Sequence, residues 1–386
     1  MLKSRLFFLL LFFCAFFLTA KPASAVVNPL VVPNNKIGIH ILTTSELPAA
    51  AKLINSNGGD WGYVTIPLQA GDENLVKWQA FMNACSKYHV IPIIRLATED
   101  DYFNTKVWAK PTPDDVVDAA NFLNSLSWPT KNRYVIIYNE VNRGDEWGGH
   151  ADPAAYAQIL STAVSVFKSR NPDFFIISAG LDNAAPNQGN TYINEYTYLR
   201  AMNQAVPGIF NQIDGFSSHS YPNPGFSQPP EPNSLTGIGS FIHERDLIQS
   251  MSNKKLPVFI TETGWSSDAV PQSTQAQYYD QAFKTVWNDP DIVAITPFLL
   301  QAGAGPFQQF SFLNTDGSKT KQYQYIYTMP KTRGTPNFPI RQVLASSTKK
   351  HTPVLITRDF TEYRPYHGSI SLSLTMENVF AYLVNR

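Results

Sequence analysis

Cysteine is scarce in this chain, whose 386 residues include only two, Cys14 and Cys85. A disulfide-stabilised scaffold needs a dense, paired set of cysteines, so that class of protein is excluded. Charge is scarce as well: charged residues make up 16% of the chain, with 30 basic against 30 acidic side chains and no basic run. Nucleic-acid-binding faces are rich in Lys and Arg, so we expect no nucleic-acid partner.

The sequence has no apolar run long enough to cross a membrane. The longest, residues 6–18, has 13 residues, whereas a spanning helix needs about 20. Lys3 and Arg5 precede this run and a small-x-small site at 23–25 follows it, which is the pattern of a cleavable secretory signal peptide. We predict a signal peptide over residues 1–25, a secreted or extracytoplasmic protein and no stable membrane insertion; an uncleaved anchor is the alternative. Cleavage would remove one cysteine and three basic residues but no acidic one, leaving a net charge of −3.

Motifs for phosphate, metal and serine-nucleophile chemistry are missing from the sequence. It contains no Gly-rich phosphate loop, no His-Glu-x-x-His pair and no Gly-x-Ser-x-Gly elbow. The histidines are scattered, and Asp100-Asp101 is better interpreted as a solvated loop than as a cation site. We therefore expect no cofactor and no metal.

Aromatic and apolar segments are what the sequence has in abundance. Aromatic residues make up 13% of the chain. From residue 36 onward, eight short and nearly continuous apolar runs recur at the spacing of β-α units, as expected for strands of a parallel sheet that is covered on both faces. These runs are residues 36–42, 61–68, 90–97, 133–141, 174–181, 213–221, 256–265 and 292–300.

Longer segments with apolar residues at three- and four-residue spacing lie between these runs and predict helices. Asp152-Pro153 supplies an N-cap and a proline at the first helical position for one of them. Eight such units in about 300 residues predict an α/β fold, a (β/α)₈ TIM barrel, over residues 26–330. A doubly wound open sheet is the competing fold, but no Gly-rich turn follows the first run. The helical segments are residues 45–57, 73–89, 114–126, 153–170, 274–287 and 321–329.

The chain changes character after about residue 330. Gly334, Pro336 and Pro339 indicate a linker. Beyond it, polar and apolar residues alternate within 353–386, which is typical of a few strands. We interpret residues 331–386 as a linker and a short C-terminal extension of unknown role.

Two glutamates end apolar runs, where a carboxylate is costly to bury. Glu140 ends the fourth run and Glu262 the seventh. Active sites of (β/α)₈ barrels lie at the carboxyl ends of the strands, and strands four and seven stand nearly opposite each other. Two facing carboxyl groups are what glycoside hydrolysis needs, one as proton donor and the other as nucleophile or base. The structural alternative is that each glutamate pairs with a basic residue such as Arg95 or Arg143.

The Asn139-Glu140 pair, the later Glu262 and the His219-x-Tyr221 run together resemble the clan A retaining glycoside hydrolases, and family 5 cellulase-like barrels in particular. The resemblance covers most of the chain. It implies that Glu140 is the acid/base, that Glu262 is the nucleophile and that Asn139 binds the sugar 2-hydroxyl. It also implies that Tyr221 hydrogen-bonds the nucleophile and that His219 contacts substrate or a catalytic carboxylate. From the residues themselves, Tyr221 should hold Glu262 ionised, and the apolar strand around Glu140 should favour its neutral form.

Two more polar residues at strand ends are candidate contacts in this site. Arg95 ends the third run and is either a second partner of Glu262 or a plain salt-bridge residue. His40 ends the first run, with substrate contact and a core histidine as the two interpretations.

Tryptophans near strand ends are candidate sugar platforms, because a pyranose presents a flat C–H face to an aromatic ring. The candidates are Trp265, Trp147 and Trp108, with core packing as the alternative for each. The eighth run lacks the tryptophan that many clan members have there, and Phe298 or Gln301 is the predicted substitute.

Taken together, these residues predict a secreted retaining β-glycoside hydrolase that cleaves a polysaccharide or oligosaccharide by double displacement. Its partner is a carbohydrate and its expected state is a monomer. Retention requires carboxyl groups about 5 Å apart, and a separation of about 9 Å would exclude it. A non-catalytic carbohydrate-binding barrel and a transglycosylase that uses the same residues are the alternatives.

Overall fold

A computed structural model of the protein describes residues 26–99, 104–303 and 305–339. The chain divides after Ile340 into two units, of which only the first contains described residues. The expected signal peptide and the strand-like segment within 353–386 lie outside the described residues. The domain boundaries therefore stay predictions.

Eight parallel strands form one sheet whose order follows the chain from β1 to β8. A parallel bridge between Ile37 and Ile295 joins the first and last strands. The (β/α)₈ barrel predicted from the sequence is confirmed, and each of the eight apolar runs contains one strand. The strands are β1 (Gly38–His40), β2 (Gly62–Leu68), β3 (Val90–Leu96), β4 (Arg133–Ile137), β5 (Phe174–Ser178), β6 (Gly215–His219), β7 (Val258–Glu262) and β8 (Ile292–Ile295).

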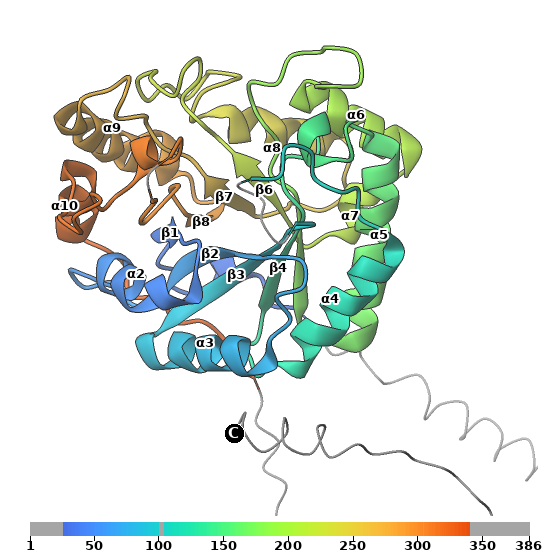
Figure 1. The fold of residues 1–386 in the computed structure, drawn as a ribbon, viewed down its shortest axis with the longest axis horizontal. Helices are drawn as coiled ribbons and strands as arrows, with labels where there is room; N and C mark the ends of the chain where they lie inside the picture. Colours follow the sequence, from blue (N-terminus) through green and yellow to red (C-terminus); the bar gives the residue numbers. More distant parts are fainter. Residues whose placement is uncertain (1–25, 100–103, 304, 340–386) are drawn as a thin grey trace, which may run out of the picture. The chain divides into compact units, whose positions relative to one another are not determined.

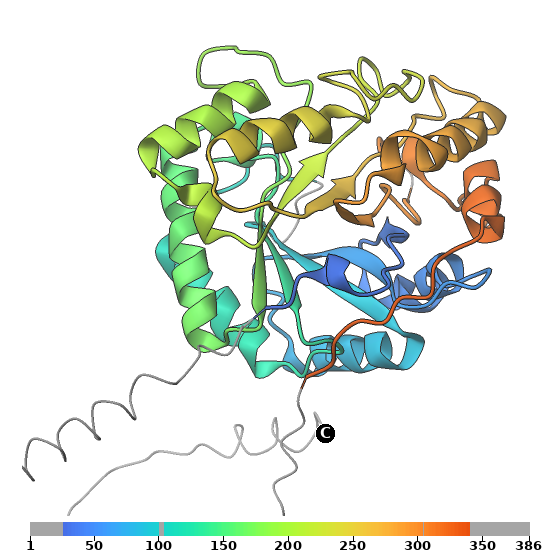
Figure 2. The same ribbon diagram turned by 180° about the vertical axis from the view of Figure 1, so that it is seen from behind.

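Helices surround the strands (Figure 1), and the view from behind shows the same arrangement (Figure 2). None of the helices within the described ranges has the length and apolarity needed to cross a bilayer. The α-helices are α2 (Leu47–Ile54), α3 (Leu75–Tyr88), α4 (Pro113–Ser125), α5 (Pro153–Arg170), α6 (Glu195–Ala205), α7 (Ile209–Gln212), α8 (Ser240–Ser250), α9 (Gln272–Lys284) and α10 (Lys321–Thr328). Short 3₁₀ helices are η1 (Pro29–Val31), η2 (Thr44–Glu46), η3 (Gly144–Glu146), η4 (Val286–Asn288) and η5 (Gln308–Phe310).

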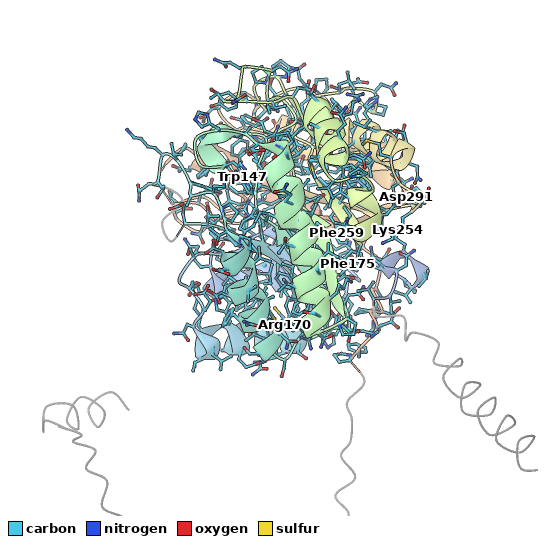
Figure 3. The ribbon with its side chains drawn as sticks, turned by 90° about the vertical axis from the view of Figure 1, so that its right-hand side faces the viewer. Trp147, Arg170, Phe175, Lys254, Phe259 and Asp291 are labelled. Atoms are coloured by element: carbon cyan, nitrogen blue, oxygen red, sulfur yellow. The ribbon has the colours of Figure 1, made fainter. Side chains whose placement is uncertain are left out.

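Helix α5 begins where the sequence predicts. The Asp152 side chain accepts a hydrogen bond from the backbone N–H of Ala155 at 3.0 Å, and Pro153 occupies the first turn. The helix then runs along the outside of the barrel to Arg170 (Figure 3). This start matters for the site because the loop before α5 carries residues of the cleft described below.

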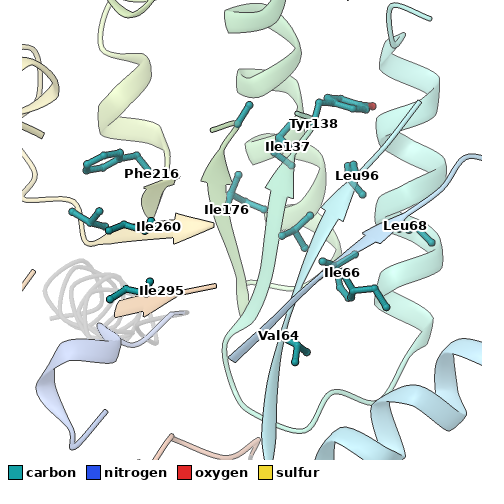
Figure 4. Close-up of a cluster of buried hydrophobic side chains, with 14 of the residues drawn as sticks. Val64, Ile66, Leu68, Leu96, Ile137, Tyr138, Ile176, Phe216, Ile260 and Ile295 are labelled. Atoms are coloured by element: carbon teal, nitrogen blue, oxygen red, sulfur yellow. The ribbon is translucent and has the colours of Figure 1, made fainter. Parts of the chain in front are cut away.

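The strands are buried on both faces, which explains their continuous hydrophobicity. Outward-facing residues such as Val64, Ile66 and Ile176 belong to a cluster that also contains Trp78 of α3 and Leu123 of α4. Figure 4 shows the strand side of this outer layer. The helices therefore pack on the barrel through aliphatic side chains that alternate with those pointing inward.

The barrel interior changes from apolar to polar along the strands. Near their amino ends, Tyr63, Tyr134, Phe175 and Phe259 form part of a buried inner cluster. Further along, the hydroxyl groups of Thr65 and Thr296 are hydrogen-bonded at 2.9 Å, and those of Ser217 and Thr261 are hydrogen-bonded as well. The ionisable side chains come last, at the carboxyl ends.

Both ends of the described chain lie at the amino-terminal end of the barrel. Val26 and Leu30 pack on the inner aromatic cluster. The backbone N–H of Thr335 donates to the Pro33 carbonyl at 2.8 Å. The first residues of the expected linker thus pair with the N-terminal segment.

Candidate active site

The chain turns sharply after β4 and brings Glu140 to the mouth of the barrel. Tyr138 and Glu140 have φ angles of +68° and +27°, in the left-handed region, which costs a non-glycine residue of order 1–3 kcal/mol. The Tyr138 ring packs outward against Trp147, with ring centroids 6.1 Å apart, while the Glu140 backbone N–H donates to the Gly180 carbonyl at 3.0 Å. Backbone strain of this kind concentrates at functional sites.

Glu140 and Glu262 face each other at this mouth, with His219 beside them. One carboxylate oxygen of each glutamate and one ring nitrogen of His219 all lie within 4.8 Å of one another. His219 fits here because its neighbour just after β5 is Gly180, where a Cβ would overlap the histidine ring. The structure thus brings together the last residues of β6 and β7 and a residue that follows β4.

Glu262 is held from two sides by hydrogen-bond donors. Arg95 donates from Nη1 to Oε1 at 2.6 Å, and the Tyr221 hydroxyl donates to Oε2 at 3.0 Å. These two hydrogen bonds fix the orientation of the carboxyl group. Arg95 therefore takes the position that the sequence analysis considered for it, next to Glu262.

His40 lies behind Glu262 and is fully buried, with its Nε2 3.7 Å from Glu262 Oε1. Burial, together with the positive charges of Arg95 and His219, lowers the pKa of His40 well below its ordinary value. The ring is therefore neutral, and it packs edge-on against Phe298 with centroids 5.1 Å apart. Burial supports a core histidine over a substrate contact, although the expected hydrogen-bonded core histidine is not what is found, because neither ring nitrogen of His40 has a hydrogen-bond partner.

Glu140 carries a charge that the sequence analysis did not predict. Burial raises the pKa of Glu140, but the hydrogen bond from His219 at 3.0 Å and the charges of Arg143, His219 and Arg95 together lower it below the ordinary value. Burial lowers the pKa of His219, yet the two glutamates raise it overall. These directions favour the ionised form of Glu140 and the protonated form of His219, so the expectation that the surroundings of Glu140 favour its neutral form is wrong for the ligand-free protein.

Asn139 lies between Arg95 and Glu146 and is hydrogen-bonded to both. Its Oδ1 accepts from Arg95 Nη1 at 2.5 Å, and its Nδ2 donates to Glu146 Oε2 at 2.7 Å. Burial and the charge of Glu140 raise the pKa of Glu146 to about 8, although Arg143 lowers it. Glu146 is thus a third carboxyl group of the site, and its raised pKa favours the neutral form.

These residues line a cavity of about 230 Å³ at the mouth of the barrel. Its lining is partly charged and partly aromatic. Trp108 is half-buried and belongs to the lining. The charged and polar lining residues are Arg95, Asn139, Glu140, Arg143, Glu146, Asp182, Tyr221, Asn223 and Glu262, and the remaining aromatic ones are Phe226, Phe298, Phe307 and Phe310.

Two of the three predicted sugar platforms are corrected by the structure. Trp147 and Trp265 are each only 1% exposed. Trp265 packs against Tyr279 and donates from its indole N–H to the Gln228 carbonyl at 2.8 Å. Neither ring has a face that a sugar can reach, so both are core residues.

Of the two predicted substitutes for the missing tryptophan at the eighth strand, Phe298 is the one that lines the cavity. This ring lines the cavity, whereas Gln301 is exposed and is not among the lining residues. The prediction for Gln301 is wrong, because the chain beyond β8 carries that side chain out to the surface.

Several cavity residues were missed by the sequence analysis. Glu146 and Asp182 follow β4 and β5 in loops, and Phe307 and Phe310 lie in the loop after β8. Arg143 was considered only as a possible ion-pair partner of one of the two glutamates, and in the structure it lies 3.4 Å from Glu140. The available signal was the concentration of acidic and aromatic residues in loops that directly follow strands.

Among the described residues, Glu140, His219 and Glu262 lie close enough together to act as ligands of a metal ion. Sequence analysis did not find this group because its members are far apart along the chain. Arg95 and Arg143 already place positive charge 2.6 and 3.4 Å from the two carboxylates, which disfavours a cation between them.

Comparison with solved structures relates the barrel to glycoside hydrolases. A family 39 glycoside hydrolase from the gut symbiont Bacteroides cellulosilyticus WH2 has a TM-score of 0.53 and 16% identity, covering 79% of this chain and 65% of that one. A GH5_18 structure from Bifidobacterium longum subsp. infantis has a TM-score of 0.53 and 10% identity, covering 76% and 78%. An exo-β-1,4-mannosidase from Opitutaceae bacterium strain TAV5 has a TM-score of 0.54 and 12% identity, covering 79% and 60%.

At these identities the likeness shows a shared fold. The resemblance to glycoside hydrolase barrels that the sequence indicated is confirmed at this level. The chain spans less than two thirds of the length of the first and third of these structures. No protein-family model and no curated sequence matches the chain.

Proposed function

We propose that this protein is a retaining β-glycoside hydrolase with Glu262 as nucleophile and Glu140 as acid/base. The observation that carries the proposal is the pair of facing carboxyl groups, whose oxygens approach within 4.8 Å at the ends of β4 and β7. Retaining glycosidases hold their two carboxyl groups about 5–5.5 Å apart, and inverting ones need about 6.5–9.5 Å to leave room for a water molecule. The (β/α)₈ fold, shared with glycoside hydrolases, supports the same assignment.

In the first step, Glu262 attacks the anomeric carbon while the glycosidic oxygen takes a proton. Hydrogen bonds from Arg95 and Tyr221 hold the Glu262 carboxyl group in position. His219 Nδ1 lies 3.0 Å from Glu140 Oε1, so this pair can share a proton, which Glu140 passes to the departing oxygen. The glycosidic bond breaks, an ester between the sugar and Glu262 forms, and the aglycone leaves.

In the second step, Glu140 acts as a base. Its low pKa suits this role, because an ionised carboxylate can take a proton from the incoming water. The water oxygen bonds to the anomeric carbon, Glu262 is released as a carboxylate, and the proton returns to the Glu140–His219 pair. Two displacements at one carbon leave the product with its original configuration.

The stereochemical course tests the proposal directly. Aryl β-glycosides and a panel of neutral polysaccharides are incubated with the purified protein, and the first product is observed by NMR before mutarotation. The β anomer is expected. An α product would exclude the retaining mechanism, and binding without turnover would favour the non-catalytic barrel.

Product analysis at high acceptor concentration covers the remaining alternative. Hydrolysis predicts free reducing sugar as the main product. A transglycosylase would instead yield longer oligosaccharides that contain the acceptor.

The proposal also includes export of a monomeric enzyme to a compartment where it meets carbohydrate. The support is the signal-peptide pattern over residues 1–25. N-terminal sequencing of protein recovered outside the cytoplasm should start at Val26. A start at Met1 would contradict cleavage, and gel filtration of the same sample checks the monomer.

A further inference from the structure

We propose that Glu146 is a positioning residue of this site, which fixes the Asn139 amide and, through Arg95, the direction of the Glu262 carboxylate. The inference rests on the proposed function for its catalytic readout. It concerns a residue that neither the two-carboxylate mechanism nor the family resemblance uses. Four observations support it.

The first is the orientation of the Asn139 amide. A carboxamide has one acceptor oxygen and one donor NH₂ group. Arg95 can only donate, and it meets Oδ1 at 2.5 Å, while Glu146 Oε2 accepts from Nδ2 at 2.7 Å. A flipped amide would set NH₂ against the guanidinium and oxygen against oxygen, losing both bonds. Glu146 and Arg95 therefore allow one orientation only.

The second is that the chain of contacts reaches the nucleophile. The same Nη1 atom of Arg95 that donates to Asn139 also donates to Glu262 Oε1 at 2.6 Å. A shift of the amide would change the direction in which this guanidinium nitrogen points. The Glu262 carboxylate is thus tied, through two intermediate side chains, to a loop on the far side of the cavity.

The third is the rigidity of the loop that carries Glu146. The residue ends the short helix η3, and the next residue, Trp147, is fully buried. At the start of η3, the backbone N–H of Gly144 donates to the Thr191 carbonyl at 2.6 Å. An acceptor can position another side chain only if it is itself held, and Glu146 meets this condition.

The fourth is the electrostatic setting of the Glu146 carboxyl group. It faces Glu140, Arg143 and Arg95, and its side chain is 14% exposed. Burial and the Glu140 charge raise the pKa of Glu146 to about 8. Below that pH, Glu146 can accept from Asn139 without adding a third negative charge to the pair of reacting carboxylates.

A double-mutant cycle tests the proposal. E146A should lower kcat about 100-fold, because misplacing reacting groups by about 1 Å costs that much, with KM changed less than threefold. E146Q keeps an acceptor for Asn139 and should recover kcat to within about fivefold of wild type. In an N139A background, E146A should have less than a twofold further effect, because its influence passes through the missing amide.

The control for loop damage is D145A in the same short helix, because Asp145 pairs with Arg143 and not with Asn139. It should change kcat less than threefold. A twofold or smaller effect of E146A, or effects of E146A and N139A that multiply, would overturn the positioning role.

A readout without catalysis separates this inference from the proposed function. The side-chain amide signals of Asn139 in an NMR spectrum should titrate with a midpoint near pH 8 in the wild type and stay constant in E146Q. If the wild type hydrolyses nothing while this titration is seen, the proposed function fails and the Glu146–Asn139 link stands. If the amide signals are unaffected by E146A, the link itself is wrong.

Discussion

The two ends of the barrel interior are built from different side chains for different purposes. At the amino-terminal end, Tyr134, Phe175 and Phe259 pack with ring centroids 5.0–5.7 Å apart. At the carboxyl end, the cationic Arg95 and two carboxylates share one small cavity. Aromatic packing stabilises the fold, whereas buried ions cost desolvation free energy and are retained for what they do. The contrast predicts that substitutions at the amino-terminal end reduce stability, whereas substitutions at the carboxyl end reduce activity.

Replacing the nucleophile should give the largest effect. Glu262→Ala is expected to lower kcat by about 10⁴-fold, roughly 5 kcal/mol of transition-state stabilisation, because no group remains to form the covalent intermediate. Azide should enter the vacated space and restore turnover with an inverted glycosyl azide as product. Steady-state kinetics and NMR of the product check both points, and an active variant without azide would refute the assignment.

Removing a buried ring at the amino-terminal end of the barrel should instead lower stability and leave catalysis nearly unchanged. Phe259 is fully buried, so Phe259→Ala should reduce the free energy of unfolding by about 3–5 kcal/mol. Its kcat, measured well below the melting temperature, should stay within threefold of wild type. Phe338→Ala removes the same ring from a position that is 56% exposed and should cost less than about 1 kcal/mol. Equal denaturation midpoints for the two variants would contradict the contrast.

A buried acid outside the active-site cavity, Glu244 on α8, should make the stability of the protein depend on pH. Glu244 is 3% exposed and accepts from the Ser218 and Ser240 hydroxyls at 2.7 and 2.9 Å. Burial raises its pKa from 4.5 to about 7. The folded state thus binds this proton more tightly than the unfolded state, so the stabilisation is complete below about pH 4.5 and is lost as the pH rises through 7, a change of about 3 kcal/mol.

The isosteric variant Glu244→Gln removes this titration. Its melting temperature should match that of the wild type near pH 5 and exceed it at pH 8. Melting curves of both proteins across this range provide the measurement. Parallel pH profiles would show that Glu244 does not titrate between these values.

The smallest expected effect distinguishes two tryptophans that the sequence analysis treated alike. Trp108 lines the cavity, so Trp108→Ala should raise KM about three- to tenfold, near 1 kcal/mol, with little change in melting temperature. Trp147 is fully buried, so Trp147→Ala should mainly lower the melting temperature. If Trp108→Ala left KM unchanged for every substrate hydrolysed, this ring would not contact the sugar.

The fold was largely predictable because covered parallel strands and amphipathic helices both leave periodic apolar patterns. Helices α6 and α8 were not among the predicted segments, and the reason is specific. Glu195 and Glu244 occupy buried positions on these helices, which breaks the apolar pattern that marks a core-facing side. Burial of an acid cannot be foreseen from spacing, because it depends on partners from other elements.

The site was predictable where strands position it and not where loops do. Glu140 and Glu262 follow directly from strand ends, and Arg95 and Tyr221 donate to Glu262 as the sequence analysis proposed. Glu146 could not be assigned in this way, because the conformation of η3 decides where its side chain points. Proximity to a strand end also failed for Trp147 and Trp265, since it does not tell whether a ring faces the cavity or the core.

The join between β1 and β8 has a consequence for how the protein folds. Ile37 and Ile295 pair across more than 250 residues of chain, and non-local contacts of this kind form slowly, after much entropy has been lost. His40 on β1 comes within 3.7 Å of Glu262 on β7 only when that ring is closed. The active-site cavity is therefore complete only after the barrel closes. In partly folded forms its charged side chains would be solvated and would lack the arrangement that catalysis needs.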